Sequence, residues 1–147
     1  MSCRCGCFDA IKIVTDDPNQ FQKTYSWDAG YDILASLPII APACDRVLVS
    51  TGLKVSIPEG YVGFLKSRSG LAVKHGLEVG AGVIDCGYTG EIKVLIHNNS
   101  QTPYNIEAGD KIAQMIILPI HRDKVELVDS LDKSSRGEGG FNSTGYR

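Results

Sequence analysis

The chain has 147 residues, which suits one domain that buries roughly two-thirds of its unfolded surface. With 43% hydrophobic and 22% charged residues it has an ordinary globular composition, and no run approaches the ~20 apolar residues that cross a bilayer. The formal net charge of −2 argues against a broad nucleic-acid-binding surface. Residues 1–10 lack a signal-peptide core, so we expect an intracellular, soluble protein with neither membrane nor nucleic acid as a partner.

The N-terminal segment is notable for three alternating cysteines, Cys3, Cys5 and Cys7. This spacing would allow a soft metal to bind, but no further Cys/His cluster completes a tetrahedral site. Five cysteines in total, an odd number, favour free thiols over a disulfide framework. A mobile tail without metal is therefore the favoured interpretation.

Short apolar runs separated by turn residues predict strands in the middle of the chain. The runs span 47–49, 53–57, 92–96 and 112–120, and the second and third alternate with polar neighbours. Sixteen glycines and six prolines punctuate the sequence at short intervals. This pattern predicts an all-β sandwich or barrel.

One segment between these runs is typical of a short helix. Ser67 or Ser69 would cap its start, residues 71–74 would form its body, and Gly76 would end it. The free N–H groups of a helix start, a serine hydroxyl and the Arg68 guanidinium are all suited to phosphate oxygens. Taken alone, a capped surface turn with a solvated arginine explains the segment at least as well.

Residues 80–90 form a second candidate site, rich in glycine. Small residues allow the backbone to approach a ligand closely. Asp85 follows two aliphatic residues, which would place its carboxylate at the rim of an apolar pocket, and Tyr88 would supply a ring face. An ordinary β-hairpin, with Asp85 in a turn hydrogen bond, is the alternative.

The composition changes near the C-terminus, where residues 132–147 contain many glycines, hydroxyls and charges and almost no apolar side chains. We therefore divide the chain into a β domain, 1–131, and a flexible arm, 132–147. One arginine, one aromatic ring and adjacent hydroxyls would suit an arm that orders over a phosphate and a base. A solvated linker is the alternative. Two weaker turn segments, 29–33 and 109–114, each carry a polar group entering a strand.

In this order and spacing, the five segments from Trp27 to Gly145 closely resemble the five motifs of the trimeric dUTPase family. The resemblance implies a jelly-roll-like β fold with one short helix and a C-terminal arm that closes over the active site. It also implies a homotrimer whose three sites are shared between chains. The activity implied is Mg²⁺-dependent hydrolysis of dUTP at the α-phosphorus to dUMP and pyrophosphate. That reaction limits uracil incorporation into DNA and supplies dUMP for dTTP synthesis.

The resemblance assigns roles residue by residue. Asp85 matches the catalytic aspartate that activates water, and Asp32 matches an acidic residue that holds magnesium mostly through water and phosphates. The phosphate contacts implied are Arg68, Ser69, Gly70, Gln114 and Arg136. The base and sugar contacts implied are Tyr88 against the deoxyribose, Phe141 over the uracil, and backbone atoms at Ala81, Gly82, Val83 and Lys93. Ser143 and Thr144 complete the matched fifth motif.

The chain departs from the family pattern at Ser67, where proline is more common, around Tyr88 at Cys86, Gly87 and Thr89, and at Asn142, where glycine is usual. Asparagine tolerates left-handed backbone well, so this last change keeps the expected loop shape. Two other functions remain open. One is a dCTP deaminase-like enzyme, which would release ammonia rather than pyrophosphate. The other is a non-catalytic regulatory protein of the same fold.

Overall fold

The computed structural model describes residues 10–140, and within them it contains ten strands and one helix. The elements, in chain order, are β1 (Lys12–Val14), β2 (Tyr31–Leu34), β3 (Ile39–Ala41), β4 (Asp45–Ser56), β5 (Tyr61–Lys66), α1 (Ser69–His75), β6 (Leu77–Gly80), β7 (Val83–Ile84), β8 (Ile92–Asn98), β9 (Tyr104–Ile106) and β10 (Lys111–Pro119). The cysteines Cys3, Cys5 and Cys7 lie outside the described residues.

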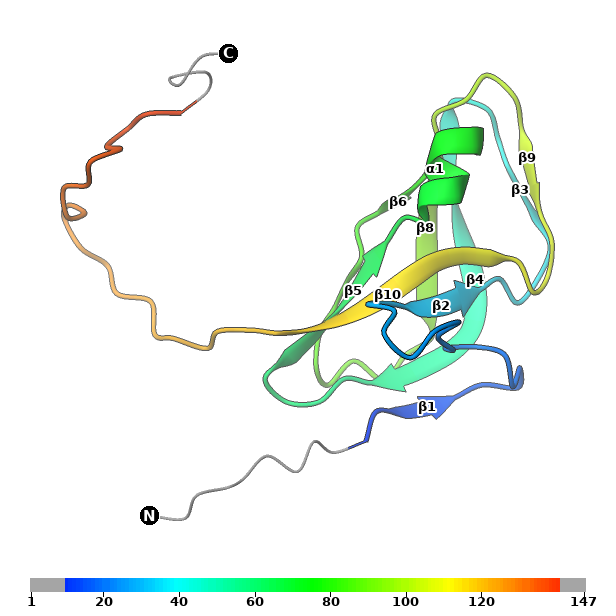
Figure 1. Cartoon of the computed structure of the whole chain (residues 1–147), viewed down its shortest axis with the longest axis horizontal. Coiled ribbons are helices and arrows are strands. Elements are labelled where there is room, and N and C mark those ends of the chain that lie inside the picture. The colour runs from blue at the N-terminus through cyan, green and yellow to red at the C-terminus, as the bar shows by residue number, and fades with distance from the viewer. Residues whose placement is uncertain (1–9, 141–147) are drawn as a thin grey trace.

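The strands form two four-stranded sheets, in the orders β1-β4-β8-β6 and β2-β10-β5-β7, and a small β3-β9 pair. Within residues 10–140 the strand pairs of these sheets are antiparallel. Neighbours such as β4 and β8 are far apart in sequence, as in a jelly roll, so the predicted all-β, jelly-roll-like fold with one short helix is confirmed (Figure 1). In the part of the chain that the structure describes, no helix is long and apolar enough to cross a membrane.

The hydrophobic core follows the alternation predicted from the sequence. In β8 the alternate residues Ile92, Val94 and Ile96 are all buried, while Lys93 between them is exposed. Met115 of β10 and Ile33 of β2 are fully buried and belong to the same core cluster. Because each fully buried aliphatic side chain contributes roughly 1.5–3 kcal/mol, this core holds the sheets that carry the polar residues described below.

Two predictions about local structure need correction. The run 47–49 and residues 53–56 of the next run belong to one strand, β4, whose register against β8 shifts at a bulge between Ser50 and Leu53. The N-cap of α1 is Arg68, and no side chain caps the helix. The Ser67 hydroxyl instead accepts a hydrogen bond from the Val79 N–H at 2.9 Å. The predicted end of the helix at Gly76 is confirmed, with a left-handed φ of 67°.

After β10 the chain leaves the sheets and continues without helix or strand to residue 140 (Figure 1). Its departure is fixed at two points: the Ile120 N–H donates to the Gly60 carbonyl at 2.9 Å, and the Arg122 guanidinium pairs with the Glu59 carboxylate. Residues 123–138 are exposed, including Val125 and Leu127.

Candidate active site

A cleft of about 590 Å³ opens beside the start of α1, where β2 and β10 run next to each other. It is lined by residues that are distant in sequence. Five of the predicted site residues line it together: Asp32, Arg68, Ser69, Gly70 and Gln114. The lining also contains more cations than carboxylates, namely Arg68, Lys74 and Lys111 against Asp28 and Asp32. An excess of positive charge suits a phosphorylated ligand. We call it the cationic cleft.

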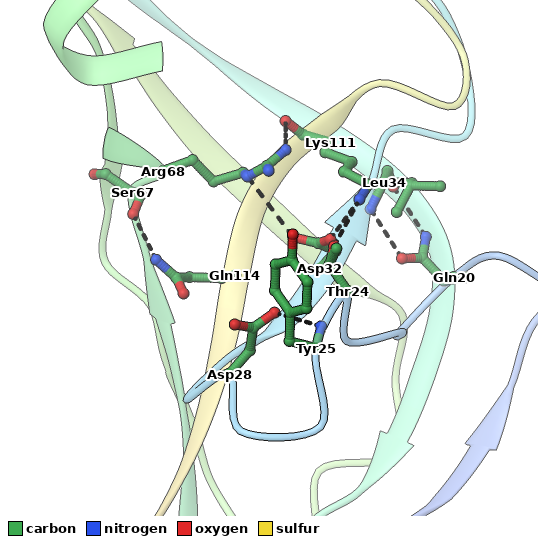
Figure 2. Close-up of polar contacts among 10 residues, drawn as sticks. All are labelled: Gln20, Thr24, Tyr25, Asp28, Asp32, Leu34, Ser67, Arg68, Lys111 and Gln114. Atoms are coloured by element: carbon green, nitrogen blue, oxygen red, sulfur yellow. Dashed lines mark hydrogen bonds and ion pairs between the residues drawn. The ribbon is translucent and has the colours of Figure 1, made fainter. Parts of the chain in front are cut away.

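Asp32 is the electrostatic centre of the cationic cleft, as Figure 2 shows. One carboxylate oxygen lies 2.7 Å from the Lys111 ammonium, and the other lies 3.7 Å from Nε of Arg68. Arg68 also donates to the Lys111 carbonyl at 3.3 Å. Only 14% of the Asp32 side chain is exposed, so the pair with Lys111 is partly shielded from solvent. Asp32 therefore aligns two cations before any ligand arrives.

Lys111 is a residue of this cleft that was not among the predicted site residues. Lys111 lies in the segment 109–114, whose sequence alone is only a weak indication of a site, and its partner Asp32 is on a different strand. The register of β10 against β2, with Gln114 opposite Asp32, places Lys111 nearby after a register shift. Only the sheet topology reveals this ion pair.

The strand β2 that carries Asp32 is anchored by a buried polar side chain. Gln20 is 1% exposed, and its amide donates to the carbonyls of Leu34 and Thr51 at 2.9 and 3.0 Å. Its oxygen accepts the Leu34 N–H at 2.8 Å (Figure 2). A buried amide with satisfied donors and acceptor specifies position strongly, because any displacement would leave polar groups unpaired.

Gln114 is held in place from two sides. Its amide donates to the Ser67 carbonyl at 3.1 Å (Figure 2). A Cβ atom built on Gly30 would lie 2.5 Å from the Gln114 side-chain oxygen and 2.9 Å from the Gln114 Cβ, so a larger residue at position 30 would displace Gln114. The side chain thus borders the cationic cleft in a fixed orientation.

Ser69 and Gly70 are less constrained. Among the described residues, the Ser69 hydroxyl has no hydrogen-bond partner, and both residues are exposed. The first N–H groups of a helix have no partner within it. A Cβ atom added at Gly70 would meet nothing within 4 Å, so no neighbouring group in the fold requires glycine there. These groups are available to a ligand.

A second cleft, of about 230 Å³, is lined by Val83, Ile84, Asp85, Tyr88, Glu91 and Lys93. Asp85 is exposed, and among the described residues its carboxylate has neither a hydrogen-bond nor an ion-pair partner. Its backbone carbonyl accepts the Tyr88 N–H at 3.2 Å, which forms a turn. The aliphatic residues Val83 and Ile84 line the same cleft, together with the charged residues Glu91 and Lys93. We call this the carboxylate cleft.

The connection from β6 to the carboxylate cleft uses unusual backbone geometry. Ala81 and Gly82 have φ values of 53° and 107°. The Gly82 carbonyl accepts the Leu65 N–H at 2.8 Å, and a Cβ on Gly82 would lie 2.8 Å from the Leu65 carbonyl oxygen. Residues 80–90 therefore do not form the ordinary β-hairpin that was the alternative. The strands β6 and β8 pair with each other, and β7, which lies between them in the chain, pairs with β5 of the other sheet.

The two clefts share no lining residue. The structure therefore does not place the groups of the cationic cleft and Asp85 in one cavity. Arg136 lies in neither cleft; its guanidinium donates to the Gly139 carbonyl at 2.7 Å. The predicted residues Phe141, Ser143 and Thr144, and also Asn142, lie outside the described residues. Within residues 10–140 no group of three or more His, Cys, Asp or Glu side chains could hold a metal ion.

A cleft that gathers cations at a helix start and another that exposes an unpaired carboxylate are suited to a β-fold hydrolase of a phosphorylated ligand. Comparison with known proteins supports that class. The family model described as dUTPase matches residues 17–145, a range that includes both clefts. The chain belongs to the dUTPase family.

Individual relatives agree with this assignment. The chain is 50% identical over 118 residues to the deoxyuridine 5′-triphosphate nucleotidohydrolase of Saccharomyces cerevisiae, an alignment that covers 80% of each protein. The corresponding protein of Candida glabrata is 49% identical over 118 residues, 80% of this chain and 82% of the relative. That of Paramecium bursaria Chlorella virus 1 is 45% identical over 117 residues, 80% of this chain and 83% of the relative.

Solved structures resemble the fold closely. The Staphylococcus bacteriophage 80alpha dUTPase with dUpNHpp has a TM-score of 0.86 and 30% identity, covering 93% of this chain and 99% of that one. A mutant dUTPase from phage phi11 of S. aureus has a TM-score of 0.77 and 29% identity, covering 85% and 100%, and that structure describes a structural Mg(II) ion.

Proposed function

We propose that Asp85 is the general base in the hydrolysis of dUTP to dUMP and pyrophosphate. The chain is a dUTP diphosphatase, as its family membership indicates. The single observation that supports the role of Asp85 is its free carboxylate, exposed at the edge of the carboxylate cleft. A carboxylate with no partner among residues 10–140 is available to accept a hydrogen bond from water and to orient that water toward the α-phosphorus.

The cationic cleft supplies the complementary part of the chemistry. Arg68 offers a planar guanidinium, and Ser69 and Gly70 offer a hydroxyl and backbone N–H groups for the phosphate oxygens. The amide of Gln114 borders the same cleft. Groups that are aligned beforehand stabilise developing charge without reorganising during the reaction. Arg136 from the C-terminal arm would add a further cation.

The donor set of the cationic cleft fits magnesium held in part by the protein. Asp28 and Asp32 provide oxygen ligands only, and the described residues contain no larger cluster. Magnesium is commonly bound by one or two carboxylates together with substrate phosphates and water. When bound, Mg²⁺ would neutralise charge on the triphosphate. We therefore propose Mg²⁺ as the cofactor, with Asp32 acting on it mostly through water.

Specificity for the uracil deoxynucleotide would come from the carboxylate cleft. Backbone groups at Ala81, Gly82, Val83 and Lys93 would hydrogen-bond the uracil edge, and a base with the wrong pattern would leave buried polar groups unpaired, at roughly 1–3 kcal/mol each. The Tyr88 ring would lie against the deoxyribose and exclude a 2′-hydroxyl. Its position supports this role, because the hydroxyl donates to the Glu91 carbonyl at 2.9 Å and so fixes the ring at the cleft.

The separation of the two clefts supports a homotrimer with shared sites. If one substrate contacts both clefts, and the clefts share no residue, different chains can supply them to one site. Residues 132–147 would form the arm that closes over this site, with Phe141 on the uracil and with Ser143 and Thr144 near the phosphates. Deleting residues 134–147 should reduce turnover by about a hundredfold and leave the β fold intact, since the described residues of this segment pack against no core residue. Full activity of the shortened chain would exclude the arm from catalysis.

The decisive experiment is to incubate the protein with each deoxynucleoside triphosphate, with Mg²⁺ or with EDTA, and to identify the products. We expect dUMP and pyrophosphate from dUTP, and loss of the activity in EDTA. Ammonia from dCTP would instead indicate the deaminase-like enzyme. Binding of dUTP without any product would indicate a non-catalytic regulator.

A further inference from the structure

The carboxylate cleft contains a second carboxylate, Glu91, which is not among the predicted site residues. Its side chain is 31% exposed and lies at the end of the connection that carries Asp85 and Tyr88. One of its oxygens, Oε2, is 3.9 Å from the Lys93 ammonium. The other, Oε1, is turned toward the backbone of β4.

Oε1 of Glu91 fills a gap in the sheet. The bulge in β4 leaves Thr51 and Gly52 without partners in the ladder with β8, and Gly52 has a φ of 63°. The N–H groups of both residues donate to Glu91 Oε1, at 3.1 and 3.0 Å. Charge-assisted hydrogen bonds of this kind are about twice as strong as neutral ones. Glu91 thereby joins the bulge in β4 to the connection that leads into β8.

The same residue also holds Tyr88, through its backbone. The Tyr88 hydroxyl donates to the Glu91 carbonyl at 2.9 Å. The ring folds back over Gly90 so closely that a Cβ there would lie 2.5 Å from the hydroxyl oxygen. Tyr88 is thus fixed to the Glu91 backbone, and the Glu91 backbone is fixed to the bulge by its own side chain. The position of the ring depends on both links.

We infer that Glu91 is a positioning residue for the selection of deoxyribose over ribose in the bound nucleotide. By binding the β4 bulge, its carboxylate holds the Tyr88 ring at the distance that admits deoxyribose and excludes ribose. This inference rests on the proposed role of Tyr88. It is separate from the identity of the reaction, because wild-type hydrolysis of dUTP tests that reaction on its own.

The test compares Glu91→Ala with Glu91→Gln. Alanine removes the acceptor for both N–H groups, whereas the glutamine oxygen preserves it and removes only the charge. We expect Glu91→Ala to reduce the preference for deoxyribose, measured as kcat/KM for dUTP over UTP and as the ratio of inhibition constants of UMP and dUMP, by about tenfold or more. Glu91→Gln should restore most of the preference. Glu78→Ala, which removes an exposed carboxylate from β6 of the same sheet, is the matched control and should leave the preference unchanged.

A purely structural role predicts a different result. A partly destabilised protein loses activity toward dUTP and UTP equally, so an unchanged preference in Glu91→Ala would overturn the inference. The second arm is a double-mutant cycle with Tyr88→Phe, which removes the hydroxyl link. If Glu91 acts through Tyr88, replacing Glu91 by alanine should change the preference much less in the Tyr88→Phe protein. An undiminished effect there would also overturn the inference, even if both variants fold with a lowered Tm.

Discussion

Asp32 and Asp85 carry the same functional group, yet the two clefts surround them differently. Asp32 is 14% exposed and paired with Lys111 and Arg68, whereas Asp85 is exposed with no partner among the described residues. A paired carboxylate orients its neighbours, and an unpaired one can bind and activate water. The comparison suggests that binding groups are aligned in advance and that the reactive group is left free.

The largest effect is expected when the free carboxylate is removed. Asp85→Asn preserves size but cannot accept a proton, so kcat should fall by about 10²–10⁴-fold. Binding of a non-hydrolysable dUTP analogue, measured by calorimetry, should change little. Asp45→Asn, an exposed aspartate outside both clefts, is the control. A near-normal rate in Asp85→Asn would remove this residue from the mechanism.

Mixing two inactive variants tests directly whether the two clefts of one site belong to different chains. Arg68→Ala impairs the cationic cleft and Asp85→Asn the carboxylate cleft, so each protein alone should be nearly inactive. If the two clefts of one site come from different chains, co-expressed trimers should recover roughly a quarter of wild-type activity, as expected for random association. Pyrophosphate release measures this recovery. Activity no higher than that of the separate variants would mean that one chain supplies both clefts.

A smaller effect is expected at Gly70. The fold has space for a side chain there, but a bound ligand would occupy that space. Gly70→Ala should raise the free energy of unfolding by about 0.5–1 kcal/mol, because glycine is unfavourable within a helix. The same methyl group would project toward the phosphates and lower kcat/KM by about tenfold. Urea unfolding and steady-state kinetics measure the two changes. A gain in stability with full activity would show that no ligand approaches Gly70.

The smallest effect concerns the exposed pair at the exit of β10. The hydrogen bond and charge of Arg122 lower the pKa of Glu59 below its usual value of 4.5, and Glu59 in turn raises the pKa of Arg122. Because the folded-state pKa of Glu59 is depressed, its stabilisation is present above pH 4.5 and is lost as the pH falls below that value. Wild type and Glu59→Gln should therefore differ slightly in hydrogen exchange near residue 120 at pH 7. They should converge at acidic pH, and a difference that grew in acid would contradict this assignment.

The strands were largely predictable from the sequence. The alternation of Ile92, Val94 and Ile96 with other residues indicates a strand that buries one face in the core. The continuity of β4 was not predictable, since its bulge is stabilised by Glu91, which follows forty residues later in the chain. The helix start was misassigned for a similar reason. Ser67 hydrogen-bonds Val79 of a neighbouring strand and so does not cap α1.

The chemical roles of the site residues could be predicted from the sequence, but their arrangement in space could not. The motif around Arg68 indicated phosphate binding, yet the pairing of Asp32 with Lys111 depends on the register of β10 against β2. The separation of Asp85 from the cationic cleft likewise follows from sheet topology, which local patterns do not contain.

The loop that borders the cationic cleft also carries the only tryptophan of the chain, Trp27. Its ring is 79% exposed and stacks on Tyr25, a lining residue of that cleft, with centroids 5.4 Å apart. Indole emission responds to nearby charge and hydration, so arrival of a triphosphate should be visible without any added label. Because Asp85 belongs to the other cleft, we expect this signal to report substrate capture rather than bond cleavage, and stopped-flow fluorescence can time the capture step by itself.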